Sequence, residues 1–211
     1  MLNVDVGSRY VPYDEGLRLQ RQFHEGIVAG DREDTLILLE HQPVYTAGKR
    51  TEDDERPVDG TPVVDVDRGG KLTWHGPGQL VGYPIIRLPD PIDVVGYVRS
   101  LESVLLEVLD AFDIHAERVE GRSGVWVKRG MTHDKIAAIG IRVAGGVTMH
   151  GFALNCSNAL TPYESIVACG IRDAGITTMS AQLGHTVSPS DVLPRVIAAF
   201  SQKFEVAHEL S

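Results

Sequence analysis

The sequence predicts an α/β domain of the α+β kind, in which a mixed, largely antiparallel sheet is flanked by helices. The chain has 211 residues, of which 43% are hydrophobic, and this suits one well-packed domain. Three helical patterns are interspersed irregularly among short β-branched runs, not in strict alternation with them. Because no linker, repeat or low-complexity stretch interrupts the chain, we expect residues 1–211 to form a single domain.

The helices are predicted from apolar spacing. Leu19, Phe23 and Ile27 recur every four residues, which predicts a helix over residues 14–29 that ends near Gly30. A longer helix follows Pro91, and its apolar stripe consists of Val98, Leu101, Leu105, Val108 and Phe112. A last helix starts at residues 188–191 and buries Val192, Val196 and Phe200. Because an interior proline costs about 3 kcal/mol, Pro194 should stand within about the first turn of that helix.

The strands are predicted as β-branched or apolar runs bounded by Gly, Pro or Asp. These runs cover residues 35–40, 63–67, 79–88, 115–119, 124–128, 135–143 and 147–155. Gly145-Gly146 separates the last two runs and predicts a hairpin turn. The charged segment 48–61 is expected to be a loop.

Composition restricts the class of protein. The formal net charge of −9 weighs against nucleic acid as a partner, because phosphate binding depends on clustered Lys and Arg. The N-terminus lacks the apolar region of a signal peptide, and no apolar run approaches the roughly 20 residues that span a bilayer. The two cysteines match no zinc or redox spacing. We therefore expect a cytoplasmic protein that binds no membrane, and we expect it to be a monomer.

The densest functional signal is the segment RGGKLTWHGPGQ, residues 68–79, between two predicted strands. It contains four glycines, which permit positive φ and close approach of the backbone to a ligand. A tight turn needs only two such residues, so a plain turn does not account for this segment. Its side chains and its backbone are therefore candidates for binding a substrate.

Two single residues are candidates for chemistry, although each has a simpler explanation. Lys135 leads into an apolar strand, where its amine is either partly desolvated or simply solvated at the strand end. Cys169 precedes a glycine at the end of an apolar run, whereas most free cysteines are small core residues. Cys156 fits the core interpretation better. Only their shared context makes Lys135 and Cys169 functional candidates.

Five blocks together resemble the lipoyl(octanoyl) transferase family across nearly the whole chain. They are the glycine-rich segment 68–79 followed by Tyr83, HQPVYT at 41–46 followed by Gly48, KIAAIG at 135–140, GFALN at 151–155, and Cys-Gly-Ile at 169–171. Five matching blocks in the same order as in the family identify the resemblance more specifically than any single block. Three positions depart from the family pattern: Ala168 stands where relatives often have proline, and Thr178-Met179 replaces a more usual Ser-Leu.

The resemblance implies a fold similar to the catalytic domain of biotin and lipoate protein ligases, and it implies site residues. Cys169 would carry the acyl group as a thioester, and Lys135 would lower the pKa of that thiol. The implied substrate-binding residues are Arg68, Gly69, Gly70, Lys71, Leu72, Thr73, Trp74, His75, Ala138, Ile139, Gly140, Gly151, Phe152 and Ala153. Supporting roles are implied for His41, Gly76 and Gln79.

The same resemblance implies the reaction and its partners. An octanoyl group would move from octanoyl-acyl carrier protein to a lysine of lipoyl domains, those of 2-oxoacid dehydrogenase complexes and of the glycine cleavage H protein. Neither ATP, a metal nor another cofactor is expected. If these partners are acidic, a local basic patch must offset the negative charge of the chain, and Lys49, Arg50, Arg68 and Lys71 are the candidates. The alternative is that these cations are scattered, solvated surface charges.

Three other interpretations stay open on the sequence alone. An ATP-dependent lipoate or biotin ligase would share the fold but needs no nucleophilic cysteine. A non-catalytic acyl-binding or carrier-binding module would make Cys169 and Lys135 incidental. A thioesterase would begin with the same chemistry and use water as the acceptor.

Overall fold

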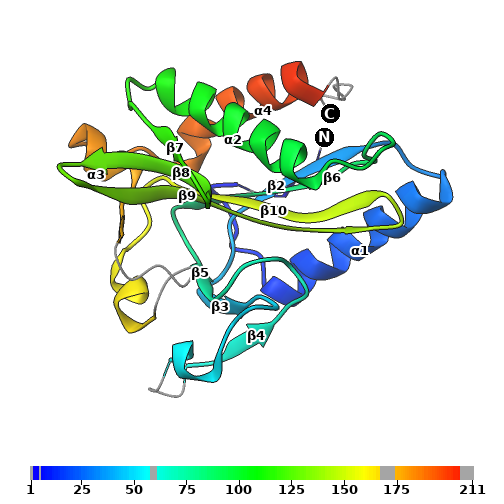
Figure 1. Ribbon diagram of the computed structural model, residues 1–211, viewed down its shortest axis with the longest axis horizontal. Coiled ribbons are helices and arrows are strands. Elements are labelled where there is room, and N and C mark those ends of the chain that lie inside the picture. Colours follow the sequence, from blue (N-terminus) through cyan, green and yellow to red (C-terminus); the bar gives the residue numbers. More distant parts are fainter. Residues whose placement is uncertain (1, 5, 58–60, 167–173, 205–211) are drawn as a thin grey trace.

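The computed structural model describes residues 2–4, 6–57, 61–166 and 174–204 (Figure 1). Its large sheet has the strand order β1 (Leu2–Val4), β2 (Thr35–Leu39), β6 (Gln79–Ile85), β10 (Val147–Asn155), β9 (Thr132–Ala144), β8 (Arg122–Arg129) and β7 (Glu117–Val119). A short strand, β11 (Gly175–Ile176), also pairs with β9. Among the described strands of this sheet, β1–β2 and β9–β11 are parallel and the other pairs are antiparallel. The predicted mixed, largely antiparallel sheet is confirmed.

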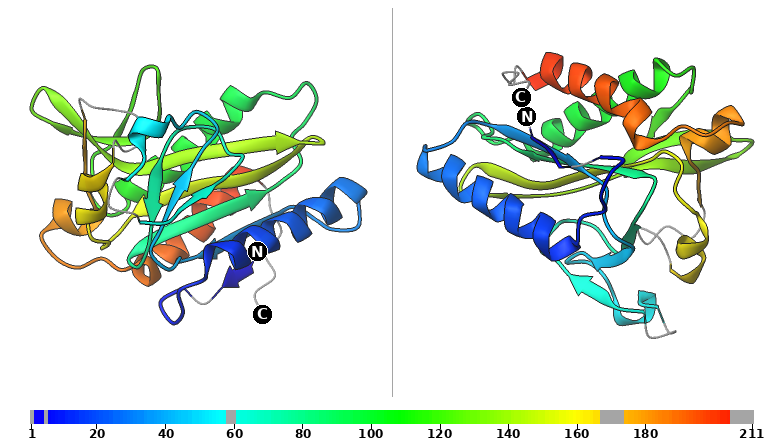
Figure 2. Two further views of the ribbon diagram at one scale, coloured as in Figure 1. Left: turned by 90° about the horizontal axis from the view of Figure 1, so that it is seen from below. Right: turned by 180° about the vertical axis from the view of Figure 1, so that it is seen from behind.

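Helices cover both faces of this sheet, as Figures 1 and 2 show. Helices α2 (Val94–Asp110) and α4 (Pro189–Phe204) pack on one face and form the larger hydrophobic core there. Helix α1 (Tyr13–Ala29) packs on the opposite face, where Ile27 joins a second core with residues of β2 and β6. A short helix, α3 (Met179–Leu183), precedes α4.

A separate three-stranded sheet lies on the α1 side of the large sheet (Figure 1). It consists of β4 (Val63–Asp65), β3 (Val44–Ala47) and β5 (Thr73–His75), in that order. Two 3₁₀ helices, η1 (Asp53–Glu55) and η2 (Thr161–Ser165), flank it. The sequence predicted β4 but missed β3 and β5, because their short polar and aromatic runs carry no clear alternation. This small sheet holds the glycine-rich segment against the large one.

Most of the other predicted elements are confirmed within a few residues. The β9–β10 hairpin turns at Gly145 and Gly146, both of which have positive φ. Val192, Val196 and Phe200 are buried on α4. Pro194, however, stands in the second turn of α4 and not within the first. The helix begins earlier because Asp191 donates its backbone N–H to the Ser188 hydroxyl and accepts hydrogen bonds from Ser188, an arrangement that caps the start.

None of the helices within the described residues combines the length and the apolar character needed to cross a membrane.

Candidate active site

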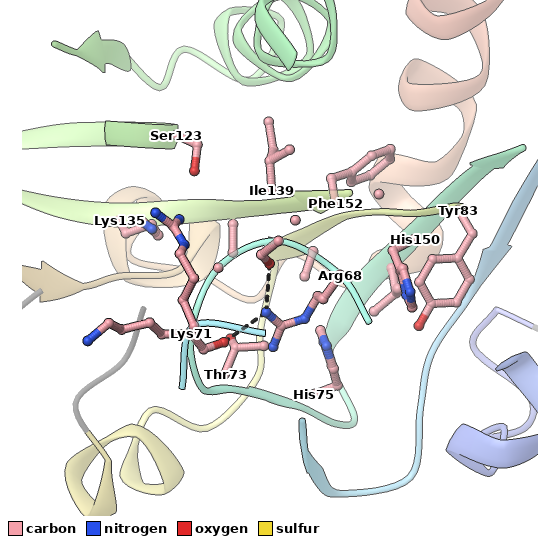
Figure 3. A pocket seen from close by; sticks show the side chains of 18 of the residues that line it. Arg68, Lys71, Thr73, His75, Tyr83, Ser123, Lys135, Ile139, His150 and Phe152 are labelled. Atoms are coloured by element: carbon pink, nitrogen blue, oxygen red, sulfur yellow. Dashed lines mark hydrogen bonds between the residues drawn. The ribbon is translucent and has the colours of Figure 1, made fainter. Parts of the chain in front are cut away.

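A cavity of about 260 Å³ lies between the large sheet and the glycine-rich segment (Figure 3). Lys135 and Ser123 lie toward one end of this view, and Tyr83 and His150 lie toward the other. Of the predicted substrate-binding residues, the cavity is lined by Arg68, Gly69, Gly70, Lys71, Thr73, His75, Ala138, Ile139, Gly140, Gly151, Phe152 and Ala153. Segments that are far apart in the sequence therefore meet around one space.

The floor of the cavity is made of small residues that face each other across two strands. Ala138 of β9 pairs with Ala153 of β10, and Gly140 pairs with Gly151. In-register neighbours of an antiparallel pair project on the same face of the sheet, so four small residues form one strip. Larger side chains at these positions would fill the space between the sheet and the glycine-rich segment.

The roof of the cavity is the segment from Arg68 to His75, which lies close against the sheet. Gly69 donates its backbone N–H to the Ile141 carbonyl at 2.9 Å. A side chain on Gly140 would place its Cβ 3.0 Å from the Gly69 carbonyl oxygen, and one on Gly48 would place its Cβ 2.4 Å from that of Gly70. The glycines thus permit close contact between backbones, one of the two uses that the sequence suggested.

Arg68 holds this segment in shape. Its Nη1 donates to the carbonyls of Gly69 and Lys71, at 3.1 and 2.8 Å, and its Nη2 donates to the carbonyl and the hydroxyl of Thr46, at 2.8 and 2.9 Å. Its exposed fraction is 8%. This corrects one expectation, since a buried guanidinium that binds its own loop does not belong to an exposed basic patch.

The side chain of Lys135 enters the cavity because of a β-bulge. Val125 of β8 pairs with Ala137, yet Trp126 pairs with Lys135, so Ile136 is an extra residue in β9. Ile136 and Ala137 both pack in the helix-side core, whereas regular alternation would send only one of them there. The bulge therefore returns Lys135 to the cavity face, and bulges commonly re-aim a side chain in this way.

The amine of Lys135 is enclosed. The residue is 5% exposed, and its Nζ lies 4.5 Å from the centroid of the Trp126 ring. Gly124 of β8 has φ +107, and a Cβ built there would lie 3.5 Å from Cε of Lys135. Lys135 is therefore buried and not simply solvated at the strand end, while its catalytic role stays a prediction.

Two histidines and two tyrosines form an aromatic cluster at the other end of the cavity. Tyr13 and Tyr83 line the cavity beside His75, and His41 lies behind them with its ring centroid 5.1 Å from that of Tyr13 and 5.8 Å from that of Tyr83. The Tyr83 hydroxyl lies 2.6 Å from His41 Nε2, while His41 Nδ1 lies 2.8 Å from the Val11 carbonyl. A carbonyl only accepts, so Nδ1 of His41 carries the proton and Nε2 accepts from Tyr83.

Burial keeps these histidines neutral. It is the main cause that lowers the pKa of His41 to about 4 and that of His75 to about 3, and the neighbouring His41 lowers the pKa of His75 further. Nδ1 of His75 donates to Oε1 of Gln79 at 2.8 Å, because the amide nitrogen of Gln79 donates elsewhere. Nε2 of His75 is therefore an acceptor at the cavity wall.

His150 lines the same end in an uncommon conformation. Its φ is +58°, in the left-handed region that side chains seldom adopt. Its backbone N–H donates to Gln20 Oε1, and its Nε2 donates to Asp67 Oδ1, both at 2.8 Å. Asp67 also pairs with Arg142. Burial first, and then the charges of Arg68 and Arg142, lower the pKa of His150 to about 3. These contacts hold a strained residue in place beside the cavity.

The structure describes one of the two cysteines. Cys156 is fully buried in the helix-side core, where burial raises the pKa of its thiol to about 12. Its interpretation as a core residue is confirmed. Cys169 lies outside the described residues, so its role and its meeting with Lys135 stay predictions. Within the part of the chain that the structure describes, no group of three His, Cys, Asp or Glu side chains could hold a metal ion.

Two predicted substrate-binding residues lie elsewhere. Leu72 and Trp74 pack with Tyr45 and Ala47 in the core of the small sheet and do not line the cavity. Alternation along β5 explains this, since Thr73 and His75 face the cavity and Trp74 faces away. The supporting residues stand behind the lining: His41 contacts Tyr83, Gln79 contacts His75, and Gly76 has no room for a Cβ beside the Trp74 ring.

Several residues line the cavity although the sequence did not predict them as substrate-binding residues. They are Tyr13, Arg50, Val81, Tyr83, Gly121, Arg122, Ser123 and His150. His150 directly precedes the GFALN block, and Tyr83 follows the glycine-rich segment, so their proximity to these motifs was an available signal. Tyr13 and Arg122 reach the cavity only through tertiary packing, which no local pattern indicates.

Comparison with solved structures defines the class of protein: it has the catalytic fold of lipoate protein ligases. A chain from an archaeal lipoylation system of Thermoplasma acidophilum, a bipartite lipoate protein ligase and its E2 lipoyl domain, superposes with a TM-score of 0.75 at 15% identity and covers all of this chain and 84% of its own. Lipoate-protein ligase A bound with ATP superposes with a TM-score of 0.72 at 15% identity, and the match covers 96% of this chain and 86% of the ligase chain. At such identities the likeness establishes the fold alone.

Sequence comparison identifies the family. The model of the lipoyl protein ligase A/B catalytic domain matches residues 12–201. The octanoyltransferase of Leifsonia xyli subsp. xyli is 65% identical over 196 residues, which cover 92% of this chain and 88% of that protein. The octanoyltransferase of Clavibacter sepedonicus is 63% identical over 195 residues, which cover 90% of this chain and 84% of that protein. The chain belongs to the lipoyl protein ligase A/B catalytic domain family and, within it, groups with the octanoyltransferases.

Proposed function

We propose that the chain transfers an octanoyl group from octanoyl-acyl carrier protein to a specific lysine of lipoyl domains through a thioester on Cys169. The observation that carries the proposal is the enclosed amine of Lys135 in a cavity with a floor of small residues. Such a cavity suits an apolar chain, and the amine can hold or accept a proton at the reacting end. The octanoyltransferase relatives support the choice of acyl group.

In the first half of the reaction, the Cys169 thiolate attacks the carbonyl carbon of the donor thioester. The tetrahedral intermediate collapses with departure of the carrier thiolate, which takes a proton from the Lys135 ammonium, and octanoyl-Cys169 and a neutral Lys135 remain. A positive charge on Lys135 favours the attacking thiolate, because an opposite charge nearby stabilises the ionised form.

In the second half, the amine of the acceptor lysine attacks the thioester carbonyl of octanoyl-Cys169. Lys135, neutral at this stage, takes a proton from the attacking nitrogen, the C–S bond breaks, and an amide forms while the Cys169 thiolate is regenerated. The acyl group is already activated as a thioester, so this route consumes no ATP.

Chain connectivity allows the two proposed catalytic residues to meet. Ile176 of β11 lies opposite Lys135 in register. Cys169 precedes Ile176 by seven residues, and each extended residue spans at most about 3.3–3.6 Å. A contact with Lys135 is therefore within reach of residue 169.

Cationic side chains at the cavity support the proposal of acidic partners. Arg50, Lys71 and Arg122 all line the cavity, although the chain carries a formal net charge of −9. Lys71 also pairs with Glu55 at 2.6 Å, which reduces its contribution. Arg50 and Lys49 are exposed. We propose that Arg50 and Arg122 attract the acidic donor toward the entrance.

The intact mass of the protein after incubation with octanoyl-acyl carrier protein tests the proposal. We expect wild type and Cys156→Ala to gain one octanoyl group and Cys169→Ala to gain none. Addition of a lipoyl domain, without ATP, should discharge the adduct and acylate the lipoyl domain. An unmodified wild-type protein would contradict covalent catalysis, and an absolute requirement for ATP would support the ligase alternative. Rapid hydrolysis of the octanoyl thioester in the absence of a lipoyl domain would indicate a thioesterase.

A further inference from the structure

Trp126 contacts the proposed catalytic lysine, and no motif singled it out. Trp126 and Lys135 are direct partners across the β8–β9 ladder, and the Nζ of Lys135 lies 4.5 Å from the ring centroid. Trp126 is fully buried, whereas the amine above it faces the cavity. An ammonium within about 6 Å of an indole face is attracted by the ring quadrupole, and most strongly when water is excluded.

The backbone around this pair is built to permit the contact. The bulge at Ile136 brings Lys135 into register with Trp126. Gly124, two residues before Trp126, has no side chain that would crowd the lysine stem. Its backbone N–H donates to Oε1 of Glu102, a fully buried carboxylate on α2 that also pairs with Arg99 and Arg118. The strand under Lys135 is therefore fixed from the helix side.

The indole of Trp126 carries a buried polar group. Nε1 of Trp126 is buried and has no hydrogen-bond partner among the described residues. An unsatisfied buried donor is destabilising, and phenylalanine would fill much of the same space without that N–H group. Indole is, however, the strongest of the aromatic cation binders. Tryptophan at position 126 thus strengthens the contact with Lys135, whereas phenylalanine would avoid the buried N–H group but bind the cation less strongly.

We propose that Trp126 is a positioning residue of the transfer reaction, and that its ring holds Lys135 as an ammonium. The inference rests on the proposed function. The ring attracts the charged form of Lys135 and not the neutral amine, so it favours the resting pair with the charge on Lys135 and a thiolate on Cys169. Trp126 should therefore speed acylation of the enzyme, the half of the reaction that needs the thiolate.

Fluorination of the indole tests this, because fluorine weakens the quadrupole of the ring and changes the size of the side chain only slightly. Trp74 is the other tryptophan of the chain, so the protein is prepared with Trp74→Phe and with tryptophan, 5-fluorotryptophan or 5,6,7-trifluorotryptophan at position 126. The single-turnover rate of acylation by octanoyl-pantetheine is followed by intact mass. We expect the rate to fall with each addition of fluorine. The trifluoro protein should be about two- to thirty-fold slower, the rate equivalent of a cation–π attraction of about 0.5–2 kcal/mol.

Controls separate this inference from a structural role and from the proposed function. Trp126→Phe protein labelled only at Trp74 should show no dependence on fluorine. Because the Arg122 guanidinium lies 5.8 Å from the same ring, the dependence should persist in Arg122→Gln. Equal acylation rates across the fluorine series, with Lys135→Ala still inactive, would overturn the role of Trp126 alone. Undiminished acylation of Lys135→Ala would overturn the proposed role of Lys135 and this inference together.

Discussion

Gly140 and Gly151 lie directly opposite each other at the centre of the β9–β10 hairpin, and a Cβ at either position would crowd another backbone. Gly140 faces the Gly69 carbonyl, and a Cβ on Gly151 would lie 2.2 Å from the Gly82 carbonyl oxygen. Neither position can change without moving the backbone. The adjacent pair, Ala138 and Ala153, is therefore where the depth of the cavity can be altered.

Ala138→Val should shift the preference of the enzyme toward shorter acyl groups. Valine adds two carbon atoms to the cavity floor, and each methylene that is no longer accommodated costs about 0.8 kcal/mol, a roughly four-fold preference. We expect the ratio of octanoyl to butyryl transfer to fall by about ten-fold, measured by mass with both donors in competition. Ala144→Val, on the same strand but outside the cavity, is the matched control. An unchanged ratio would show that the acyl chain does not lie over this floor.

Arg68→Met should destabilise the protein and disorganise the cavity roof. The variant keeps the apolar length of the side chain but loses the hydrogen bonds to Thr46, Gly69 and Lys71. Hydrogen bonds from charged groups contribute about 1.5–3 kcal/mol each, and some of these carbonyls will rehydrate, so we expect a loss of about 2–4 kcal/mol in the free energy of unfolding. Urea denaturation measures it. Arg50→Met removes an exposed cation and should leave the stability unchanged.

The sequence predicted the parts of the fold that local patterns determine. The β9–β10 hairpin followed from alternation and from Gly145-Gly146, and the helices followed from apolar spacing. The small sheet was missed because β3 and β5 gain their strand structure by pairing with each other. The bulge at Ile136 was missed too, since nothing in KIAAIG marks where two successive residues face one core. The resemblance led to Lys135, but only the register shows how it reaches the cavity.

Three buried histidines, His41, His75 and His150, should make the stability depend on pH. The pKa is lowered to about 4 for His41 and to about 3 for His75 and His150 in the folded protein, whereas the unfolded chain binds these protons near pH 6.5. Between these limits the unfolded state holds more protons, so stability is complete above about pH 6.5 and falls as the pH falls toward 4. Each histidine contributes a slope of at most about 1.4 kcal/mol per pH unit. Urea denaturation at pH 7, 6 and 5 measures it.

The His75→Gln variant isolates this contribution from that of the carboxylates. Between pH 6.5 and 4.5, the free energy of unfolding of this variant should change with pH less steeply than that of wild type, by up to about 1.4 kcal/mol per pH unit. His185 is exposed, so His185→Gln should keep the wild-type slope. Identical slopes in all three proteins would contradict the neutral, buried state of His75.

Thiol labelling should distinguish the two cysteines. The pKa of the Cys156 thiol is raised to about 12 by burial, so very little of it is thiolate at neutral pH. We expect iodoacetamide to modify native wild type once, at Cys169, and peptide mapping identifies the site. Cys169→Ala should stay unmodified until it is unfolded in urea, after which Cys156 reacts. Modification of Cys156 in the native protein would show that its core opens readily.

Charge reversal at the entrance should weaken the encounter with an acidic carrier more than the chemistry. Arg50 and Arg122 line the cavity, and exposed charges act over about 8 Å at physiological ionic strength. We expect Arg50→Glu to raise the KM for octanoyl-acyl carrier protein several-fold, with little change in kcat and with a weaker dependence on salt. Octanoyl-pantetheine, which lacks the acidic protein, should be used equally well by the variant and by wild type. An equal rise in KM for both donors would assign Arg50 to acyl binding in the cavity. An unchanged KM for both donors would show that Arg50 does not belong to the docking surface.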